Sequence, residues 1–368
     1  MTTPRDLLYS ETEDELRAAV RSLLTDRCAP AQVVARAESG EPHDRDLWKT
    51  LASDMGLAGL LVPESLGGQG AGAREAAVVL EELGRRVAPV PYLTSAVIAT
   101  ETLLGCASTA AEELVGALAA GRSVGILALP LSTAPSASYA RIEETGGRLT
   151  GRITAVADAA SADVLLVPAG SGLYAVDTTA DGVHLTAQTP LDLTRPLSVL
   201  TLESAPGRLL AAAGEADSAV RRGLRAGAAL LASEQLGLAD WCLTETVAYT
   251  KSRNQFNRPV GSFQALKHRL AELWLQTVHA RAAARNAADA LVTGSHEAPL
   301  AASLAQAYCS PVAVHAAEEA LQLHGGIGMT WEHPVHLYLK RAKTDSIALG
   351  TAGAHREAVA ELVDLQAP

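Results

Sequence analysis

Apolar residues in the first part of the chain recur at the spacing of a helix. Leu16, Val20, Leu23 and Leu24 lie three or four positions apart or side by side, which is typical of one face of an amphipathic helix. Ser10 precedes this run, and acidic residues follow it in the first predicted turn, so the helix is predicted to begin there. The first third of the chain is therefore predicted to be helical.

Near Val124 the pattern changes to short apolar runs and alternation, which is typical of strands. Gly146-Gly147 separates two of these runs and is predicted to form a hairpin turn, because glycine readily supplies the positive φ such a turn needs. The predicted strands are Val124–Leu129, Arg141–Glu144, Arg148–Val156, Val164–Val167, Leu173–Val176, Val183–Leu185 and Leu197–Leu202.

From about Ala211 the helical spacing returns. One long helix is predicted to carry the following apolar residues on a single face: Phe263, Leu266, Leu270, Leu273 and Trp274. At 368 residues the chain is too long for one ordinary core. We therefore predict a helical domain over residues 1–122, a β-barrel domain over 123–206 and an antiparallel four-helix bundle over 207–368.

Composition narrows the class of protein. Hydrophobic residues make up 48% and charged residues 19%, which is enough for a sizeable core. The net charge of −11 argues against nucleic-acid binding, because such proteins need clustered cations. No apolar run approaches the roughly 20 residues of a membrane span, and no signal peptide is recognisable. We expect a cytoplasmic protein that associates with neither nucleic acid nor membrane.

The cysteines and histidines do not predict a metal site. The four cysteines are scattered and form no Cys-x-x-Cys pair, which excludes a dense disulfide framework or zinc ribbon. His333 and His336 lie three apart beside Glu332, but Pro334 between them argues against a shared helix face. Without an evident third ligand, a surface or interface pair is the preferred interpretation, and we predict no metal.

Two polar, glycine-bearing segments interrupt the C-terminal helices. The first runs from Arg253 to Gln264, and its arginine offers a planar set of donors suited to a diphosphate. Phe256 within it has a ring that can cover an adenine or isoalloxazine. The second, Gln322 to Gly328, has three glycines that let backbone N–H groups approach an anion. Taken alone, each also fits an ordinary turn or helix C-cap.

Together and in order, these features resemble the acyl-CoA dehydrogenase family over essentially the whole chain. Gly56–Glu64, followed by Leu66-Gly67-Gly68, looks like the early signature of that family. The Arg253–Gln264 segment resembles its Arg-x-x-Phe-Gly…Gln motif, with Asn257 where glycine is usual. Gln322–Gly328 is similar to its Gln-x-x-Gly-Gly-x-Gly motif.

The resemblance implies a function and a cofactor. Such enzymes have the three-domain fold predicted above, use FAD, oxidise acyl-CoA thioesters and pass electrons to an electron-transfer flavoprotein. It also implies that certain residues hold the ADP half of an FAD seated mainly in a neighbouring subunit. These residues are Arg253, Gln255, Phe256, Gln264, Gln322, Gly325 and Gly326.

The groups that the family uses at the flavin ring and substrate are replaced here. The chemistry needs a positioned carboxylate as base, but Leu349 and Gly227 occupy the family's two positions for it. The family's Thr-Glu-Pro loop and Lys-x-Trp-Ile-Thr strand correspond to residues 128–132 and 152–156. Glu234, two turns beyond Gly227, is interpreted as a structural helix residue.

This pattern of loss leads to a hypothesis about a complex. The chain would be the non-catalytic subunit of a heteromeric acyl-CoA dehydrogenase whose partner carries the glutamate. The Asp192–Arg195 turn and Leu349-Gly350-Thr351 also resemble the smaller subunits of actinobacterial heteromeric enzymes, including those acting on sterol side chains. A self-contained flavoenzyme with other chemistry and a flavin-free scaffold are the alternatives. Alanines in place of bulky aromatics suit a large acyl-CoA.

Overall fold

The first part of the chain is helical, as predicted. In the computed structural model, which describes residues 7–366, the Ser10 hydroxyl accepts a hydrogen bond from the Glu13 N–H, and the Glu13 carboxylate accepts one from the Ser10 N–H. This reciprocal pair fixes the start of α1. The α-helices here are α1 (Glu11–Arg27), α2 (Pro30–Ala37), α3 (Arg45–Lys49), α4 (Ala73–Arg86), α5 (Thr100–Leu103) and α6 (Thr109–Ala119). A buried π-helical segment, Tyr92–Ala99, precedes α5.

Two four-stranded sheets follow. One has the strand order β1-β4-β5-β8, with β1 and β4 parallel, and the other has the antiparallel order β2-β3-β7-β6. The strands are β1 (Gly125–Leu127), β2 (Glu143–Thr145), β3 (Arg148–Ala157), β4 (Val164–Ala169), β5 (Gly172–Asp177), β6 (Val183–Gln188), β7 (Leu197–Pro206) and β8 (Arg208–Ala211). The predicted hairpin at Gly146-Gly147 is confirmed, with φ of 59° and 80°. β2 begins two residues later than predicted.

A bulge in β3 bends that strand toward the loop after β1. The register with β7 shifts between Ile153 and Val156, and Ala155 has a φ of 54°. The Ala155 carbonyl then accepts a hydrogen bond from the Leu131 N–H at 2.9 Å. Bulges commonly re-aim a strand next to a functional site. Here the bulge joins residues 128–132 to residues 152–156, the two segments expected from the sequence to replace the family's flavin contacts.

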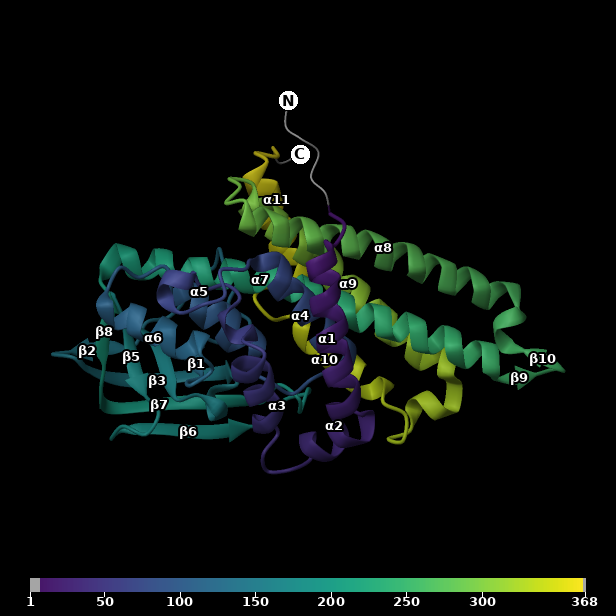
Figure 1. The fold of residues 1–368 in the computed structure, drawn as a ribbon, viewed down its shortest axis with the longest axis horizontal. Helices are drawn as coiled ribbons and strands as arrows, with labels where there is room; N and C mark the ends of the chain where they lie inside the picture. The colour runs from purple at the N-terminus through teal and green to yellow at the C-terminus, as the bar shows by residue number, and fades with distance from the viewer. Residues whose placement is uncertain (1–6, 367–368) are drawn as a thin grey trace.

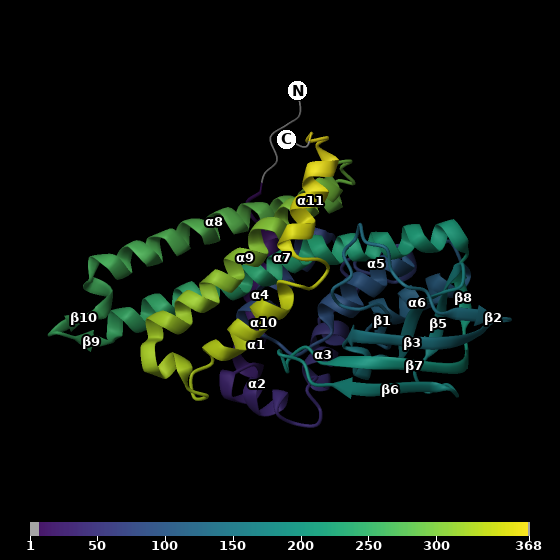
Figure 2. The same ribbon diagram turned by 180° about the vertical axis from the view of Figure 1, so that it is seen from behind.

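The C-terminal part of the chain is again helical. Its helices are α7 (Ala213–Ser252), α8 (Gln264–Val292), α9 (Ala298–His324), α10 (Val335–Asp345) and α11 (Ala352–Leu362). Figures 1 and 2 show that α7 spans the molecule, from above the sheets to the far tip of the bundle. It packs against α4, α8 and α9.

The predicted apolar face of α8 needs two corrections, because Phe263 lies just before the helix and Trp274 faces outward. Leu273 is buried as expected, but the Trp274 side chain is 59% exposed. Adjacent residues on a helix point about 100° apart, and this rotation places Trp274 on the exposed side of α8 while Leu273 faces the core. No helix in residues 7–366 is long and apolar enough to cross a membrane.

A buried ionic cluster ties the loop before β7 to the helical bundle. The Arg195 guanidinium contacts Glu234 on α7 at 2.8 Å and Asp345 on α10 at 2.5 Å. Arg341, also on α10, donates to Glu234 and Asp192. We call these five residues the ionic cluster; every member is at least 95% buried. Glu234 therefore has the structural role that the sequence predicted.

Candidate functional site

The predicted ADP-binding segment after α7 forms a hairpin that projects from the tip of the bundle (Figure 1). β9 (Asn254–Gln255) pairs with β10 (Arg258–Pro259), and the two residues between them have positive φ, 53° at Phe256 and 58° at Asn257. Asparagine adopts this conformation more readily than most residues, so Asn257 fits where the family has glycine. Residues 251–259 are all exposed.

The side chains on this hairpin offer their functional groups outward. The Arg253 guanidinium has no ion pair within the described residues, and Gln255 and Gln264 are exposed. The Phe256 ring is 86% exposed and meets Phe263 edge-on, with centroids 6.1 Å apart. An aromatic ring this exposed on a tight turn is available to cover a flat ligand.

The second predicted segment is an open glycine turn at the end of α9. Gly325 has a φ of 61° and a ψ of −138°, a backbone conformation that residues other than glycine rarely adopt. A Cβ added at Gly325 or Gly326 would meet no atom within 4 Å. Gln322 is exposed one turn earlier. The backbone of this turn is therefore accessible to a ligand from outside the chain.

An aromatic stack holds these two segments at the same end of the bundle. The Tyr249 ring, on the last turn of α7, stacks on His324, with centroids 4.4 Å apart. The Arg253 N–H donates to the Tyr249 carbonyl, and Gly325 directly follows His324. All the predicted ADP-binding residues therefore lie on chain segments that meet at this end.

The two positions that the sequence predicts to correspond to the family's base lie together elsewhere in the structure. A Cβ at Gly227 would lie 3.1 Å from the Leu349 Cδ1 and 2.6 Å from the Ile98 Cγ1. Leu349 is buried with a φ of 56°, and its N–H donates to the Leu131 carbonyl at 2.7 Å. The fold therefore brings together two positions that are far apart in the chain, a contact that the sequence did not predict.

A small apolar cavity marks this meeting point. Its volume is about 30 Å³, room for one or two water molecules. No titratable side chain lines it; the lining residues are Thr94, Ile98, Ile126, Leu127, Leu129, Pro130, Leu131, Ala157, Leu224 and Leu349. Two of the segments expected to depart from the family pattern contribute to this lining, through Leu129–Leu131 and Leu349, and Ala157 directly follows the third.

The carboxylate of Asp158 adjoins this cavity, but both of its oxygens are occupied. One lies 2.8 Å from the His43 Nε2, and the other accepts the Thr94 hydroxyl at 2.7 Å. Burial opposes ionisation of Asp158, yet these hydrogen bonds outweigh it and hold its pKa below the ordinary value. A stabilised carboxylate with no unpaired oxygen is a poor proton acceptor.

A larger cavity opens on the other side of the same loop and strand. It measures about 450 Å³, and the residues that line it include Ser132, Thr133, Tyr139, Arg141 and Arg152. The Arg141 guanidinium lies over the Tyr139 ring at 5.5 Å. This cavity has donors for an anionic or polar ligand, but it contains no carboxylate.

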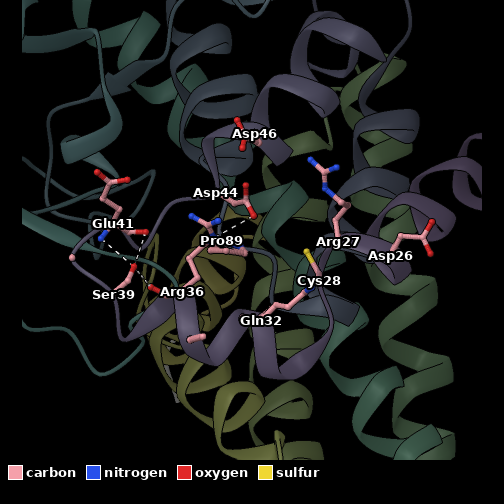
Figure 3. Close-up of a pocket in the computed structure, with 13 residues that line it drawn as sticks. Asp26, Arg27, Cys28, Gln32, Arg36, Ser39, Glu41, Asp44, Asp46 and Pro89 are labelled. Carbon is pink, nitrogen blue, oxygen red and sulfur yellow. Dashed lines mark hydrogen bonds and ion pairs between the residues drawn. The ribbon is translucent and has the colours of Figure 1, made fainter.

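A third cavity, of about 750 Å³, lies among the N-terminal helices (Figure 3). Arg36 and Asp44 in its lining pair with each other at 3.2 Å. Burial raises the pKa of the Cys28 thiol to about 12, which makes it a poor nucleophile. None of the predicted site residues lines this cavity.

Sequence reasoning missed part of the ionic cluster. It noted the Asp192–Arg195 turn and Glu234 but not Arg341 and Asp345, which complete the cluster. The sequence did contain a signal for them: Arg341 and Asp345 carry opposite charges four positions apart, a spacing that places both on one face of a helix. The sequence does not show that this face points into the core.

Comparison with known proteins places the whole chain among related sequences. Residues 10–122 match the acyl-CoA dehydrogenase N-terminal domain, and residues 218–363 match the acyl-CoA dehydrogenase C-terminal domain. Acyl-CoA dehydrogenase IpdE2 of Mycobacterium tuberculosis is 38% identical, over 90% of this chain and 91% of its own length.

Solved structures are similar over nearly their full length. A chain of the ChsE4–ChsE5 complex from Mycobacterium tuberculosis has a TM-score of 0.87 and 29% identity, over 99% of this chain and 100% of its own. A chain of the Tcur3481–Tcur3483 steroid ACAD has a TM-score of 0.85 and 30% identity, over 96% of this chain and 98% of its own.

Proposed function

Because this chain belongs to the acyl-CoA dehydrogenase family, we propose that it is the non-catalytic subunit of a heteromeric, FAD-dependent acyl-CoA dehydrogenase. A partner subunit carries the glutamate base and holds the flavin ring. The present chain contributes Arg253, Gln255, Phe256, Gln264 and the glycine turn at Gly325 to the ADP half of that cofactor.

The observation that carries this proposal is the direction in which the hairpin points. Residues 251–259 project from the tip of the bundle and are all exposed, so they face away from the chain's own interior. Arg253 directly follows α7 and lies 26 residues after Gly227, which at 1.5 Å per helical residue is roughly 39 Å. The hairpin and the interior cavity therefore cannot surround one cofactor within a single chain.

The interior supports the same conclusion. Abstracting the α-proton of a thioester requires a carboxylate aimed at that carbon. The cavity at Leu349 is lined by aliphatic residues, Thr94 and Pro130, and a glutamate at Gly227 would have to displace Ile98. We infer that the proton is removed by the partner's glutamate.

The residues at the bundle tip fit an ADP group by their chemistry. Arg253 supplies an uncommitted guanidinium for a diphosphate, and the open turn at Gly325 and Gly326 supplies backbone N–H groups. FAD, when bound, supplies the oxidant for α,β-dehydrogenation of an acyl-CoA. We propose an electron-transfer flavoprotein as the acceptor and, from the likeness to the steroid ACAD, a sterol-derived acyl-CoA as the substrate class.

An arginine substitution in the assembled complex tests this proposal. We expect Arg253→Met, which keeps an apolar stem, to lower FAD retention at least tenfold after gel filtration, because a charged hydrogen-bond donor to phosphate is lost. Arg356→Met, at an exposed arginine on α11, is the matched control and should leave retention unchanged. Equal retention in the two variants would contradict a trans-acting Arg253.

The alternative of a self-contained flavoenzyme has one observation in its favour. The 450 Å³ cavity beside Arg141 and Arg152 is where such an enzyme would hold a ligand of its own. Under this alternative the isolated chain would retain flavin, and Arg152→Met rather than Arg253→Met would release it. The same retention assay therefore separates the two functions.

A further inference from the structure

Three potential metal ligands from separate elements meet at the bundle tip. Glu245 lies on α7, His324 ends α9, and His333 lies in the loop before α10. One ligand atom from each residue lies within 4.8 Å of those of the other two. The three positions are far apart in sequence, so only the fold brings them together.

His324 is held in the orientation of a metal ligand. Its Nδ1 lies 2.7 Å from the Ala320 carbonyl, which can only accept, so Nδ1 carries the proton. Its Nε2 therefore presents a lone pair, and this atom is buried without a hydrogen-bond partner in the described residues. His324 is only 1% exposed. A carbonyl that fixes the ring and tautomer in this way is the usual support of a metal-binding histidine.

The other two side chains are available to complete the set. The His333 ring lies beside that of His324, with centroids 4.2 Å apart. The Val335 N–H donates to the His333 Nδ1 across 3.3 Å, a long bond that a metal–nitrogen bond can replace. Glu245 has no cationic partner among residues 7–366 and is partly exposed.

We propose that Glu245, His324 and His333 bind a zinc ion. Two imidazoles and one carboxylate are a ligand set that suits Zn²⁺ better than the harder Mg²⁺ or Ca²⁺. Tetrahedral zinc needs these ligand atoms about 3.3 Å apart, and the partly exposed Glu245 and His333 can rotate to close the remaining distance. A water molecule takes the fourth position.

Such an ion would link the last turns of α7 to the end of α9 and the loop that follows. Tyr249 already stacks on His324 there, and the hairpin at Arg253 and the turn at Gly325 extend from these same elements. If the proposed function holds, the zinc fixes the spacing of the two ADP-binding segments. Metal binding itself does not depend on that function.

Metal content of the full chain tests the proposal. The chain is stripped with a chelator, loaded with ZnCl₂, dialysed and measured by mass spectrometry. We expect one equivalent of zinc in the wild type, and less than about 0.2 equivalent in His333→Ala and Glu245→Gln. His296→Ala, at an exposed histidine outside the cluster, should keep one equivalent. Zinc below 0.2 equivalent in the wild type, or equal in all variants, would overturn the site.

Two further readouts keep the result unambiguous. Co²⁺ loaded in place of Zn²⁺ should give the absorption bands of a tetrahedral site in the wild type and lose them in Glu245→Gln. Zinc should also raise the Tm of the wild type by about 2–5 °C without affecting that of His333→Ala. Zinc binding with unaltered FAD retention in Arg253→Met would sustain this site while refuting the proposed function.

Discussion

Replacing Glu234 with glutamine should shift a proton within the ionic cluster. With every group ionised, the cluster's three carboxylates and two guanidiniums would carry one net negative charge. Burial, and then the charge of Glu234, raise the pKa of Asp345 to about 8, so Asp345 is protonated at pH 7 and the cluster is neutral. In Glu234→Gln, Asp345 loses its nearest like charge and ionises, which restores neutrality.

The expected changes in the free energy of unfolding follow from this proton shift. Glu234→Gln should lower the free energy of unfolding by about 1–3 kcal/mol, because it weakens charged hydrogen bonds from both arginines. Asp345→Asn should cost less than about 1 kcal/mol below about pH 4, where an amide replaces an acid that is neutral in both states, and should stabilise the protein at pH 7, because the wild type must take up a proton there on folding. The double variant leaves one buried positive charge unpaired and should cost about 5–6 kcal/mol, of which about 3–5 is the penalty for an unpaired buried charge.

Urea unfolding at pH 7, followed by circular dichroism, measures the change in unfolding free energy of each of the three variants. The double-mutant cycle should show at least 1 kcal/mol of extra destabilisation beyond the sum of the single variants. Additive losses, within about 0.5 kcal/mol, would refute the assignment of the proton to Asp345.

A proton on Asp345 in the folded state also makes the free energy of unfolding depend on pH. An unfolded aspartate titrates near pH 3.9, so between about pH 4 and 8 the folded state holds a proton that the unfolded state has lost. The contribution of Asp345 to the unfolding free energy therefore falls as pH rises through this window. We expect the wild type to lose stability relative to Asp345→Asn from pH 5 to pH 8; a constant difference would contradict this.

Three further predictions follow from the backbone and the thiols. Gly325→Ala should cost about 1–3 kcal/mol in unfolding free energy, because its φ is positive, whereas Gly326→Ala, with open space around it, should cost under about 0.5 kcal/mol. Gly84→Ala and Gly237→Ala should each cost about 3 kcal/mol or more and lower the Tm, because each new Cβ would lie about 2 Å from a backbone oxygen across the contact between α4 and α7. All four cysteines are buried, so a thiol reagent should modify none of them in the folded protein and four after denaturation.

The order of helices, strands and helices was predictable from local patterns. Apolar period, the Ser10 cap and the Gly146-Gly147 turn act over a few residues, and the structure confirms each of them. Trp274 was misplaced because it lies about 100° around α8 from the buried Leu273, on the exposed side of that helix. The hairpin around Phe256 was predictable as a break between helices, but its outward direction depends on how α7 and α8 pack.

The rest of the site depends on contacts between distant segments. The sequence predicts no contact between Gly227 and Leu349, nor that Arg341 reaches Asp192 and Glu234. These contacts arise because α7 runs past the sheets and through the bundle. The local spacing of apolar residues does not predict this arrangement. The sequence motifs predict candidate site residues, and the tertiary packing determines which of them meet.

Flavin content is the most direct test of the split site. The chain expressed alone, and the chain co-expressed with a glutamate-bearing acyl-CoA dehydrogenase subunit, are purified, and bound flavin is measured by absorbance per mole of protein. The account predicts little or no flavin in the isolated chain and near-stoichiometric flavin in the complex. Near-stoichiometric flavin in the isolated chain would contradict it, because the chain would then complete a cofactor site without a catalytic partner.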